Sequence, residues 1–229
     1  MTAWTIQNTY QLVRMAAKKE SAEKTKASIL LAAMNTIRAK GYAATNVDDI
    51  CLAAGITKGA FFHHFKTKED MACQAASFFS KHADELFAGA RYNKIEDPLE
   101  RLLGYISFRE EIIQGELWQF TCLLGTLVQE VHSSHPAIRE SCQEGIWGHA
   151  STLVPMIEEA IKAHPPIEPV DALELALFSQ AVLQGGFVLS KAKGSSEPAL
   201  AAVRRLHRYI KFLFSHPEFP KQPQHEQRP

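Results

Sequence analysis

The sequence lacks the signatures of several large protein classes. Its four cysteines, at positions 51, 73, 122 and 142, form no C-x-x-C pair, so neither a disulfide scaffold nor a zinc ribbon is expected. We see no run of about 18 apolar residues and no apolar signal-peptide core, so we expect a cytoplasmic protein without a membrane partner. Glycine-rich nucleotide-binding motifs and the G-x-S-x-G motif of hydrolases are also absent, so no cofactor is expected.

What the sequence does have is helical periodicity along almost its whole length. Apolar residues recur at spacings of three and four, and sustained strand-like alternation is absent, so the predicted fold class is all-α. Glycine and proline punctuate the pattern. Helices are predicted over residues 23–40, 45–54, 57–66, 68–91, from 97 onward, 116–132, 136–163, 169–193 and 197–215.

The net charge of the chain is zero, but it is unevenly distributed. Residues 1–68 carry ten Lys and Arg against four Asp and Glu, a balance of +6, and the remainder of the chain carries −6. A basic head on an acidic body indicates that the head binds a polyanion. The predicted division is a disordered tail (1–20), a small helical head (21–67), a larger helical body (68–216) and a second disordered tail (217–229).

The head contains a pattern typical of a helix-turn-helix, the segment VDDICLAAGITKGAFFHHF at residues 47–65. Two helices that cross steeply need a small residue where they touch, which Cys51 supplies, and a turn residue that tolerates positive φ, which Gly55 supplies. Thr45, with Asp48 three residues later, predicts the N-cap of the first of these helices. Such a motif places its second helix in the major groove of DNA.

Residues 25–71 closely resemble the DNA-binding domain of the TetR/AcrR family of transcriptional regulators. The resemblance implies a homodimer that binds a palindromic double-stranded DNA operator, by default as a repressor. It also implies that a small hydrophobic or electrophilic effector binds the body and releases the operator. Carried over onto this sequence, the DNA-binding residues are Thr45, Thr57, Lys58, Gly59, Ala60, Phe62, His63, His64 and Lys68.

Two of these positions depart from the family pattern. Phe62 and His64 stand where the family usually has tyrosine, and Phe62 has no hydroxyl to donate to a phosphate. That contact is either lost or replaced by His63 or His64, and for both histidines placement on the surface without a DNA contact is the alternative. Phe61 and Phe65, by contrast, are expected to pack in the core of the head.

The body carries bulky residues between the head and its last two helices. The resemblance implies an effector cavity there, and the predicted ligand-binding residues are Phe78, His82, Phe108, Trp118, Cys122 and Trp147. Ordinary core packing is the alternative for each aromatic residue. A ligand against Phe78 or His82 is expected to tilt the helix over 68–91 and so change the position of the head.

Cys122 lies in the segment FTCLLGTLVQEV, residues 120–131, which is similar to a segment in one branch of the family. Some family members with a similar cysteine sense reactive electrophiles, which alkylate or oxidise the thiolate. The sequence shows no neighbouring cation to activate Cys122, so a buried, inert thiol is the alternative.

The two C-terminal helices are predicted to form a dimer interface. The segment 169–193 has apolar stripes on more than one face, so it is expected to be buried on more than one side. The resemblance implies that it and residues 197–215 pair with their copies as a four-helix bundle. The predicted interface residues are Leu175, Phe178, Val182, Leu189, Val203 and Ile210. A larger monomeric core is the alternative.

Two other classes compete with a regulator. A helical enzyme would use Cys122 or a His–carboxylate pair, without a catalytic motif to support it. An interaction protein that has lost DNA binding would fit the substitution at Phe62. His132 and His135 have a spacing that suits metal ligands, but they fall at a predicted helix end, so no metal site is expected.

Overall fold

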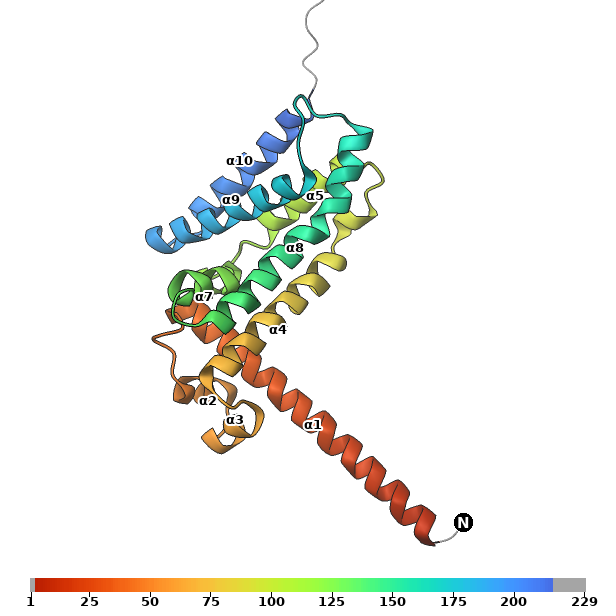
Figure 1. The fold of residues 1–229 in the computed structure, drawn as a ribbon, viewed down its shortest axis with the longest axis vertical. Helices are drawn as coiled ribbons and strands as arrows, with labels where there is room; N and C mark the ends of the chain where they lie inside the picture. Colours follow the sequence, from red (N-terminus) through yellow and green to blue (C-terminus); the bar gives the residue numbers. More distant parts are fainter. Residues whose placement is uncertain (1–2, 216–229) are drawn as a thin grey trace, which may run out of the picture.

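The computed structural model describes the backbone of residues 3–215 and the side chains of residues 22–215, and every regular element in that part of the chain is a helix (Figure 1). This confirms the predicted all-α fold. The elements are α1 (Ala3–Lys40), α2 (Val47–Ala54), α3 (Lys58–His64), α4 (Lys68–Ala88), the 3₁₀ helix η1 (Arg91–Lys94), α5 (Pro98–Glu111), α6 (Leu117–Phe120), α7 (Leu123–Val131), α8 (Pro136–Ala163), α9 (Ala172–Lys193) and α10 (Glu197–Leu213). The predicted C-terminal tail, 217–229, lies outside the described residues.

The first helix is longer than the sequence pattern predicted. We expected a disordered tail over residues 1–20, and the structure instead extends α1 back to Ala3. The physical reason is composition. Residues 1–40 contain neither glycine nor proline, the two residues that most strongly interrupt a helix.

The head is formed by the second half of α1 with α2, α3 and the start of α4. Ile29, Ala33 and Ile37 of α1 share one face, and all three are fully buried. They belong to an apolar cluster that also contains Ile50 and Phe61 from the helix-turn-helix. The same cluster continues into the body through buried side chains of α7 and α8, so no apolar boundary separates the head from the body.

The N-cap of α2 is one residue later than predicted. Asn46, not Thr45, accepts the backbone N–H of Asp49 at 2.8 Å, and the Asp49 carboxylate accepts the N–H of Asn46 at 2.8 Å. This reciprocal pair is a capping box. After α2, Gly55 adopts the predicted positive φ of 67° and Cys51 is buried, so both features of the predicted turn are confirmed.

The body is built around α8, which packs against α4, α5 and α9 (Figure 1). Helix α4 starts in the head, where Met71, Ala72 and Ala75 are fully buried, and continues into the body. Asp97 caps α5 and Pro98 occupies its first turn, as the sequence indicated. Helix α4 therefore runs without a break from the head into the body.

The helix predicted over 116–132 is broken in two. Thr121 has an extended backbone and ends α6, and Cys122 begins α7 as its N-cap. The sulfur of Cys122 accepts the backbone N–H of Gly125 at 3.5 Å, which gives the new helix its first capping contact. The break leaves backbone carbonyls that need donors from elsewhere in the fold.

Helix α9 is the one described helix that is long and apolar enough to cross a membrane by length and composition. The expectation that no stretch came near this limit was therefore wrong. The helix packs between α8 and α10 in the body, with Leu175, Ala176 and Leu183 buried. Core helices of soluble proteins meet the same criterion, and the burial of α9 fits that reading.

The predicted interface residues divide between two faces. Leu175, Val203 and Ile210 are 3% exposed or less, so they belong to the core of one protomer and the prediction is corrected there. The faces of α9 and α10 that carry these residues pack against each other and against the body. Phe178 is 44% and Leu189 60% exposed, whereas Val182 is half-buried against the core.

Candidate functional site

The short helix α3 is held on the head by one face. Phe61 is fully buried and Phe65 is 1% exposed, as predicted, and their ring centroids lie 5.4 Å apart. Thr57 caps the helix, since its hydroxyl oxygen accepts the N–H of Ala60 at 3.2 Å. The opposite face of α3 is left open to solvent, as a recognition helix requires.

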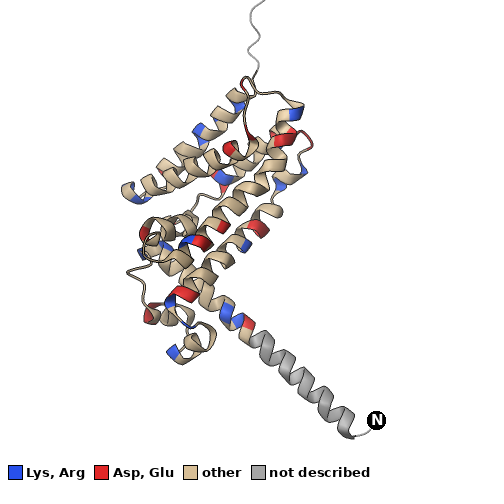
Figure 2. Cartoon of the chain, viewed as in Figure 1, with Lys and Arg blue, Asp and Glu red and all other residues tan. Residues whose placement is uncertain are grey.

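The surface of the head carries all the residues predicted to contact DNA except Thr45. Thr57, Lys58, Gly59, Phe62 and His63 are exposed, and Ala60, His64 and Lys68 are half-buried. Figure 2 shows basic positions on α3 and on α1 near it. Lys58 Nζ lies 2.9 Å from Asp48 in an ion pair that is exposed on both sides. Such pairs contribute little, so a phosphate or base could displace Asp48 at low cost.

The prediction that Thr45 contacts DNA is corrected by the structure. Thr45 has no exposed surface, and its hydroxyl donates to the carbonyl of Gly41 at 2.6 Å. The physical reason is the shift of the N-cap, because Asn46 takes the exposed capping position and Thr45 turns inward. A phosphate cannot reach Thr45 without opening the turn between α1 and α2.

Two predicted contact residues have perturbed protonation. Lys68 Nζ lies 4.0 Å above the ring of Tyr42, and burial lowers the pKa of Lys68. Burial also lowers the pKa of His64, and the charges of His63 and Lys26 lower it further. His64 is therefore neutral at pH 7, so its ring can both donate and accept a hydrogen bond.

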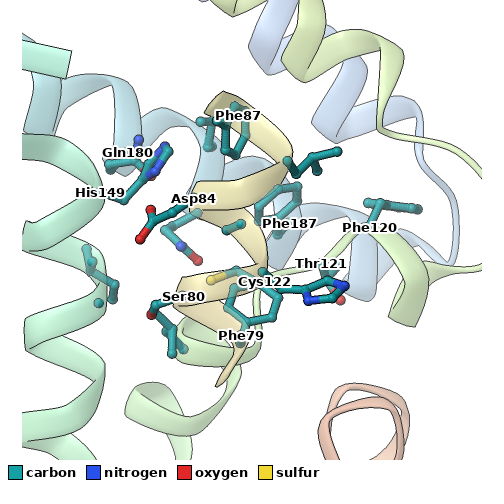
Figure 3. A pocket seen from close by; sticks show the side chains of 18 of the residues that line it. Phe79, Ser80, Asp84, Phe87, Phe120, Thr121, Cys122, His149, Gln180 and Phe187 are labelled. Carbon is teal, nitrogen blue, oxygen red and sulfur yellow. The ribbon is translucent and has the colours of Figure 1, made fainter. Parts of the chain in front are cut away.

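A cavity of about 400 Å³ lies in the body (Figure 3). This volume falls within the range of small-molecule sites. Helices α1, α4, α5, α8 and α9 and the segment from α6 to α7 all contribute to the wall. Large apolar side chains dominate the lining, among them Phe79, Leu86, Phe87, Ile112, Phe120 and Phe187.

Of the predicted ligand residues, His82 and Cys122 line this cavity. Phe78 does not, although its ring stacks on His82 with centroids 5.5 Å apart. Phe108 packs edge-on against Phe87 at 5.6 Å, on the core side of that ring. For Phe78 and Phe108 the alternative of ordinary packing is the one that the structure supports.

Trp118 and Trp147 are also outside the lining. Trp147 is 49% exposed on α8. Trp118 lies beside the guanidinium of Arg38, with 6.0 Å from the guanidinium carbon to the ring centroid. Chain position could not reveal this, because neighbouring residues of a helix point in different directions.

A polar network closes one end of the cavity. The Arg109 side chain donates from Nε to the hydroxyl of Tyr105 at 2.9 Å and from Nη2 to Nε2 of His149 at 2.7 Å. Tyr105 also lies 3.0 Å from Nε2 of His149 and accepts from Gln180 at 3.4 Å. Arg109, His149 and Gln180 line the cavity, so these groups are available to a ligand.

The network fixes the protonation state of His149. Burial lowers the pKa of His149 to about 3, and the positive charge of Arg109 adds to this shift. Because a guanidinium can only donate, Nε2 must accept, and the proton of the neutral ring lies on Nδ1. That Nδ1 is buried and has no hydrogen-bond partner among the described residues.

Two cations lie near Cys122 that sequence reasoning did not find. Burial lowers the pKa of Lys191, which lines a hollow together with Cys122, and the charge of Glu130 opposes that shift. Burial likewise lowers the pKa of Arg38, which lines the cavity together with Cys122. Lys191 also donates to the hydroxyl of Thr126 at 2.6 Å. Cys122 therefore lies at a helix N-terminus with cations on the neighbouring helices.

Two contacts tie the cavity wall to the head. Arg38 of α1 donates to the carbonyls of Gln119 and Thr121 at 3.1 and 3.4 Å, at the break between α6 and α7. At the other end of α7, the Glu130 carboxylate accepts the N–H groups of Tyr42 and Ala43 at 2.6 and 2.8 Å. The segment that borders the cavity is thus hydrogen-bonded to the first turn after α1.

A helix-turn-helix head on a helical body with an internal cavity defines the class of a ligand-binding, DNA-binding regulator. Residues 29–74 match the family described as bacterial regulatory proteins, tetR family. Residues 98–206 match the tetracyclin repressor-like C-terminal domain. The chain belongs to the TetR family.

Similar proteins agree with this assignment. Over 104 residues the chain is 30% identical to the transcriptional regulator AcuR of Cereibacter sphaeroides, a match that covers 45% of this chain and 48% of AcuR. Over 79 residues it is 42% identical to the HTH-type transcriptional repressor KstR2 of Mycobacterium tuberculosis, covering 33% of this chain and 37% of KstR2. The chain thus spans about half or less of the length of these relatives.

A solved structure shares the fold over most of the chain. The transcriptional regulator of the TetR family from Agrobacterium tumefaciens superposes with a TM-score of 0.72 at 23% identity, covering 82% of this chain and 98% of the other.

We predict that His149 makes the stability of the protein depend on pH. The folded pKa lies below the unfolded value near 6.5, so below that pH the unfolded chain binds a proton that the folded chain excludes. The free energy of unfolding should fall by roughly 1.4 kcal/mol per pH unit between about pH 6 and pH 4. His149→Gln keeps an acceptor for Arg109 but cannot bind the proton. In urea titrations the slope of this variant should therefore be smaller by about 1.4 kcal/mol per pH unit, the contribution of one proton.

The range above pH 7 is the internal control, since His149 is neutral there in both states and the two proteins should have parallel curves. Equal slopes for the wild type and His149→Gln at pH 4–6 would show that His149 titrates normally.

Proposed function

We propose that this protein is a homodimeric, cytoplasmic transcriptional repressor that binds operator DNA through α3 and releases it when a small molecule fills the cavity. The observation that carries the proposal is the double role of α4. Its first turns hold Met71 and Ala75 in the core of the head, and its later residues, from Phe79 to Phe87, line the cavity. A ligand cannot press on this wall without acting on the support of the recognition helix.

The DNA contact is supported by what α3 exposes. Lys58 at its start can donate to a guanine edge or a phosphate. Gly59 beside it has no side chain, and the nearest atom to a Cβ there would be Thr57 Oγ1 at 3.8 Å, so DNA backbone can approach closely. His63 is exposed, and His64 is half-buried and neutral. Either can donate a hydrogen bond to a phosphate in place of the tyrosine that Phe62 replaces.

Dimerisation is supported by apolar side chains that one protomer leaves exposed on α9 and α10. These are Phe178, Val188 and Leu189 on α9 with Tyr209 and Phe212 on α10, which are 38–63% exposed. The ring centroids of Phe178 and Tyr209 lie 5.2 Å apart, so exposed apolar side chains of the two helices are in contact there. Large exposed patches of this kind mark protein–protein contacts. A palindromic operator needs two copies of the head.

Release by ligand follows from linkage. Rigid duplex DNA fixes the distance between the two heads, so any movement of α4 that changes this distance costs DNA-binding energy. A ligand that favours the displaced state lowers the affinity for DNA by the same factor as DNA lowers the affinity for the ligand. Couplings of about 1–3 kcal/mol give roughly 5- to 150-fold release.

An electrophile that reacts with Cys122 is a second form of effector. Cys122 lines the cavity, caps α7 and lies near Arg38 and Lys191. Burial raises the pKa of each of the other three cysteines, Cys142 to about 12. An adduct on Cys122 would occupy the same cavity as a reversible ligand.

We predict that Lys58→Ala weakens DNA binding. If Lys58 contacts a base, the loss is about 1–3 kcal/mol, or roughly 5- to 150-fold in Kd. Duplexes selected by the wild type from a random pool serve as targets in a gel-shift titration. Lys81→Ala is the matched control, because Lys81 is an exposed lysine of α4 within the body and should leave Kd unchanged. Wild-type affinity in Lys58→Ala would remove α3 from the proposed contact surface.

We predict that Phe178→Asp disrupts the dimer, because it places an unpaired charge in the apolar surface that a partner would bury. Sedimentation velocity should show a monomer where the wild type is a dimer. Leu52→Asp is the control, since Leu52 is 85% exposed in the head and should leave the dimer intact. An undisturbed Phe178→Asp dimer would place the interface on another face.

We predict that N-ethylmaleimide first modifies Cys122, and that one adduct reduces DNA binding. Intact mass and peptide mapping give the site, and gel shift gives the effect. Cys122→Ser should resist inactivation by the reagent. First modification elsewhere, or full DNA binding by the singly modified protein, would contradict electrophile sensing at Cys122.

A further inference from the structure

Arg109, at the polar end of the cavity, has no carboxylate partner in the described part of the chain. Its two neighbours in sequence are acidic, but Glu110 pairs with Arg204 at 2.7 Å and Glu111 pairs with Arg91 at 2.5 Å. Among residues 22–215, no ion pair within 4.0 Å joins Arg109 to a carboxylate, and Arg109 lines the cavity. A half-buried cation without a partner is costly, and an anion supplied by a ligand would remove that cost.

The guanidinium of Arg109 is held in place. Its central carbon lies 4.3 Å from the centre of the Phe87 ring, and its contacts with Tyr105 and His149 use two of its five N–H groups. The remaining N–H groups have no protein acceptor among the described residues. An orientation fixed in this way favours a planar, two-oxygen anion, which can accept two parallel hydrogen bonds.

The other groups at this end fit the same ligand. His149 is neutral, so it adds no competing charge, and the side-chain amide of Gln180 can donate to a second oxygen. Figure 3 shows His149 and Gln180 on one side of the cavity, with Phe79, Phe120 and Phe187 on the other. Aromatic rings thus face this polar end across the cavity, whose lining also includes Arg38, Ser80 and Thr121.

Two carboxylates also line the cavity and must be weighed. Asp84 of α4 and Glu144 of α8 are both exposed, so water solvates them without a ligand. Arg109 is half-buried and forms no ion pair with either carboxylate, although Asp84 lies beside His149 on the same side of the cavity (Figure 3). The unpaired charge of Arg109 therefore favours an anionic ligand. An organic amine bound by Asp84 and Glu144 is the competing outcome of the test.

We propose that the effector of this protein is an amphipathic organic carboxylate, whose acid group pairs with Arg109 and whose apolar body lies among Phe79, Phe120 and Phe187. The inference rests on the proposed function, in which this cavity is the effector site.

The test compares acids with neutral amides of the same shape. Octanoate and octanamide form one pair of probes, and 3-phenylpropanoate and 3-phenylpropanamide form the other. Isothermal titration calorimetry on the full chain at pH 7.5 should show at least about tenfold tighter binding of one acid than of its amide, because hydrogen bonds to a charged partner are the stronger ones. Octylamine tests the competing outcome.

The variants assign the preference to one residue. Arg109→Gln should abolish the difference between acid and amide, and Arg109→Lys should keep part of it. Arg91→Gln is the matched control, because Arg91 is exposed, pairs with Glu111 and lies outside the cavity, so the preference should be unchanged. If Arg109→Gln does not fold, the acid–amide comparison on the wild type and on Arg109→Lys still decides.

Three results with the wild type would overturn the inference: both acids bind no better than their amides, neither acid binds at millimolar concentration, or octylamine binds more tightly than octanoate. Among the variants, an unchanged acid preference in Arg109→Gln or in Arg109→Lys would also overturn it. Gel shift on selected duplexes is a separate readout. A protein that binds DNA and ignores acids retains the proposed function without this inference. One that binds acids at Arg109 and no DNA retains the inference without the function.

Discussion

The structure depends on one apolar core that the head and the cavity wall share. Ile29 and Ile37 of α1, Leu123 and Leu127 of α7 and Ile138 of α8 are all fully buried in the same cluster. Such cores are close-packed and shift between discrete arrangements instead of deforming smoothly. Because α7 begins at the cavity and ends in this core, the head cannot keep its position when α7 moves. The boundary predicted between residues 67 and 68 divides the sequence, but it does not divide the packing.

Two polar contacts also link the α6–α7 segment of the cavity wall to the head. The break at Thr121 leaves carbonyls that Arg38 satisfies, and the Glu130 carboxylate takes up the amides of Tyr42 and Ala43. Both contacts involve a charged side chain, and hydrogen bonds to charged groups are the stronger ones. The segment between them, from Thr121 to Glu130, therefore connects the proposed effector site to the turn that precedes α2.

The sequence predicted what local chemistry decides. The helix-turn-helix followed from Cys51 and Gly55, because it depends on residues only a few positions apart. Three-dimensional packing decided the rest. Both stripes of α9 are apolar, so the pattern could not tell that Leu175 faces its own body and Phe178 faces outward. Likewise, the isolation of Arg109 depends on partners that its acidic neighbours find on other elements.

The proposed effector site and the shared core explain one another. An uncompensated cation beside Tyr105, which is 1% exposed in the body core, leaves the empty cavity electrostatically unfavourable. A bound anion relieves this cost, and the energy that it gains is available to displace the wall only if the wall is coupled to the head. Without the buried contact of α7 with α1, the same ligand would bind and change nothing at α3. Tight packing far from the DNA is therefore the condition for control of DNA binding, because linkage requires that the ligand and the DNA prefer different arrangements of one connected body.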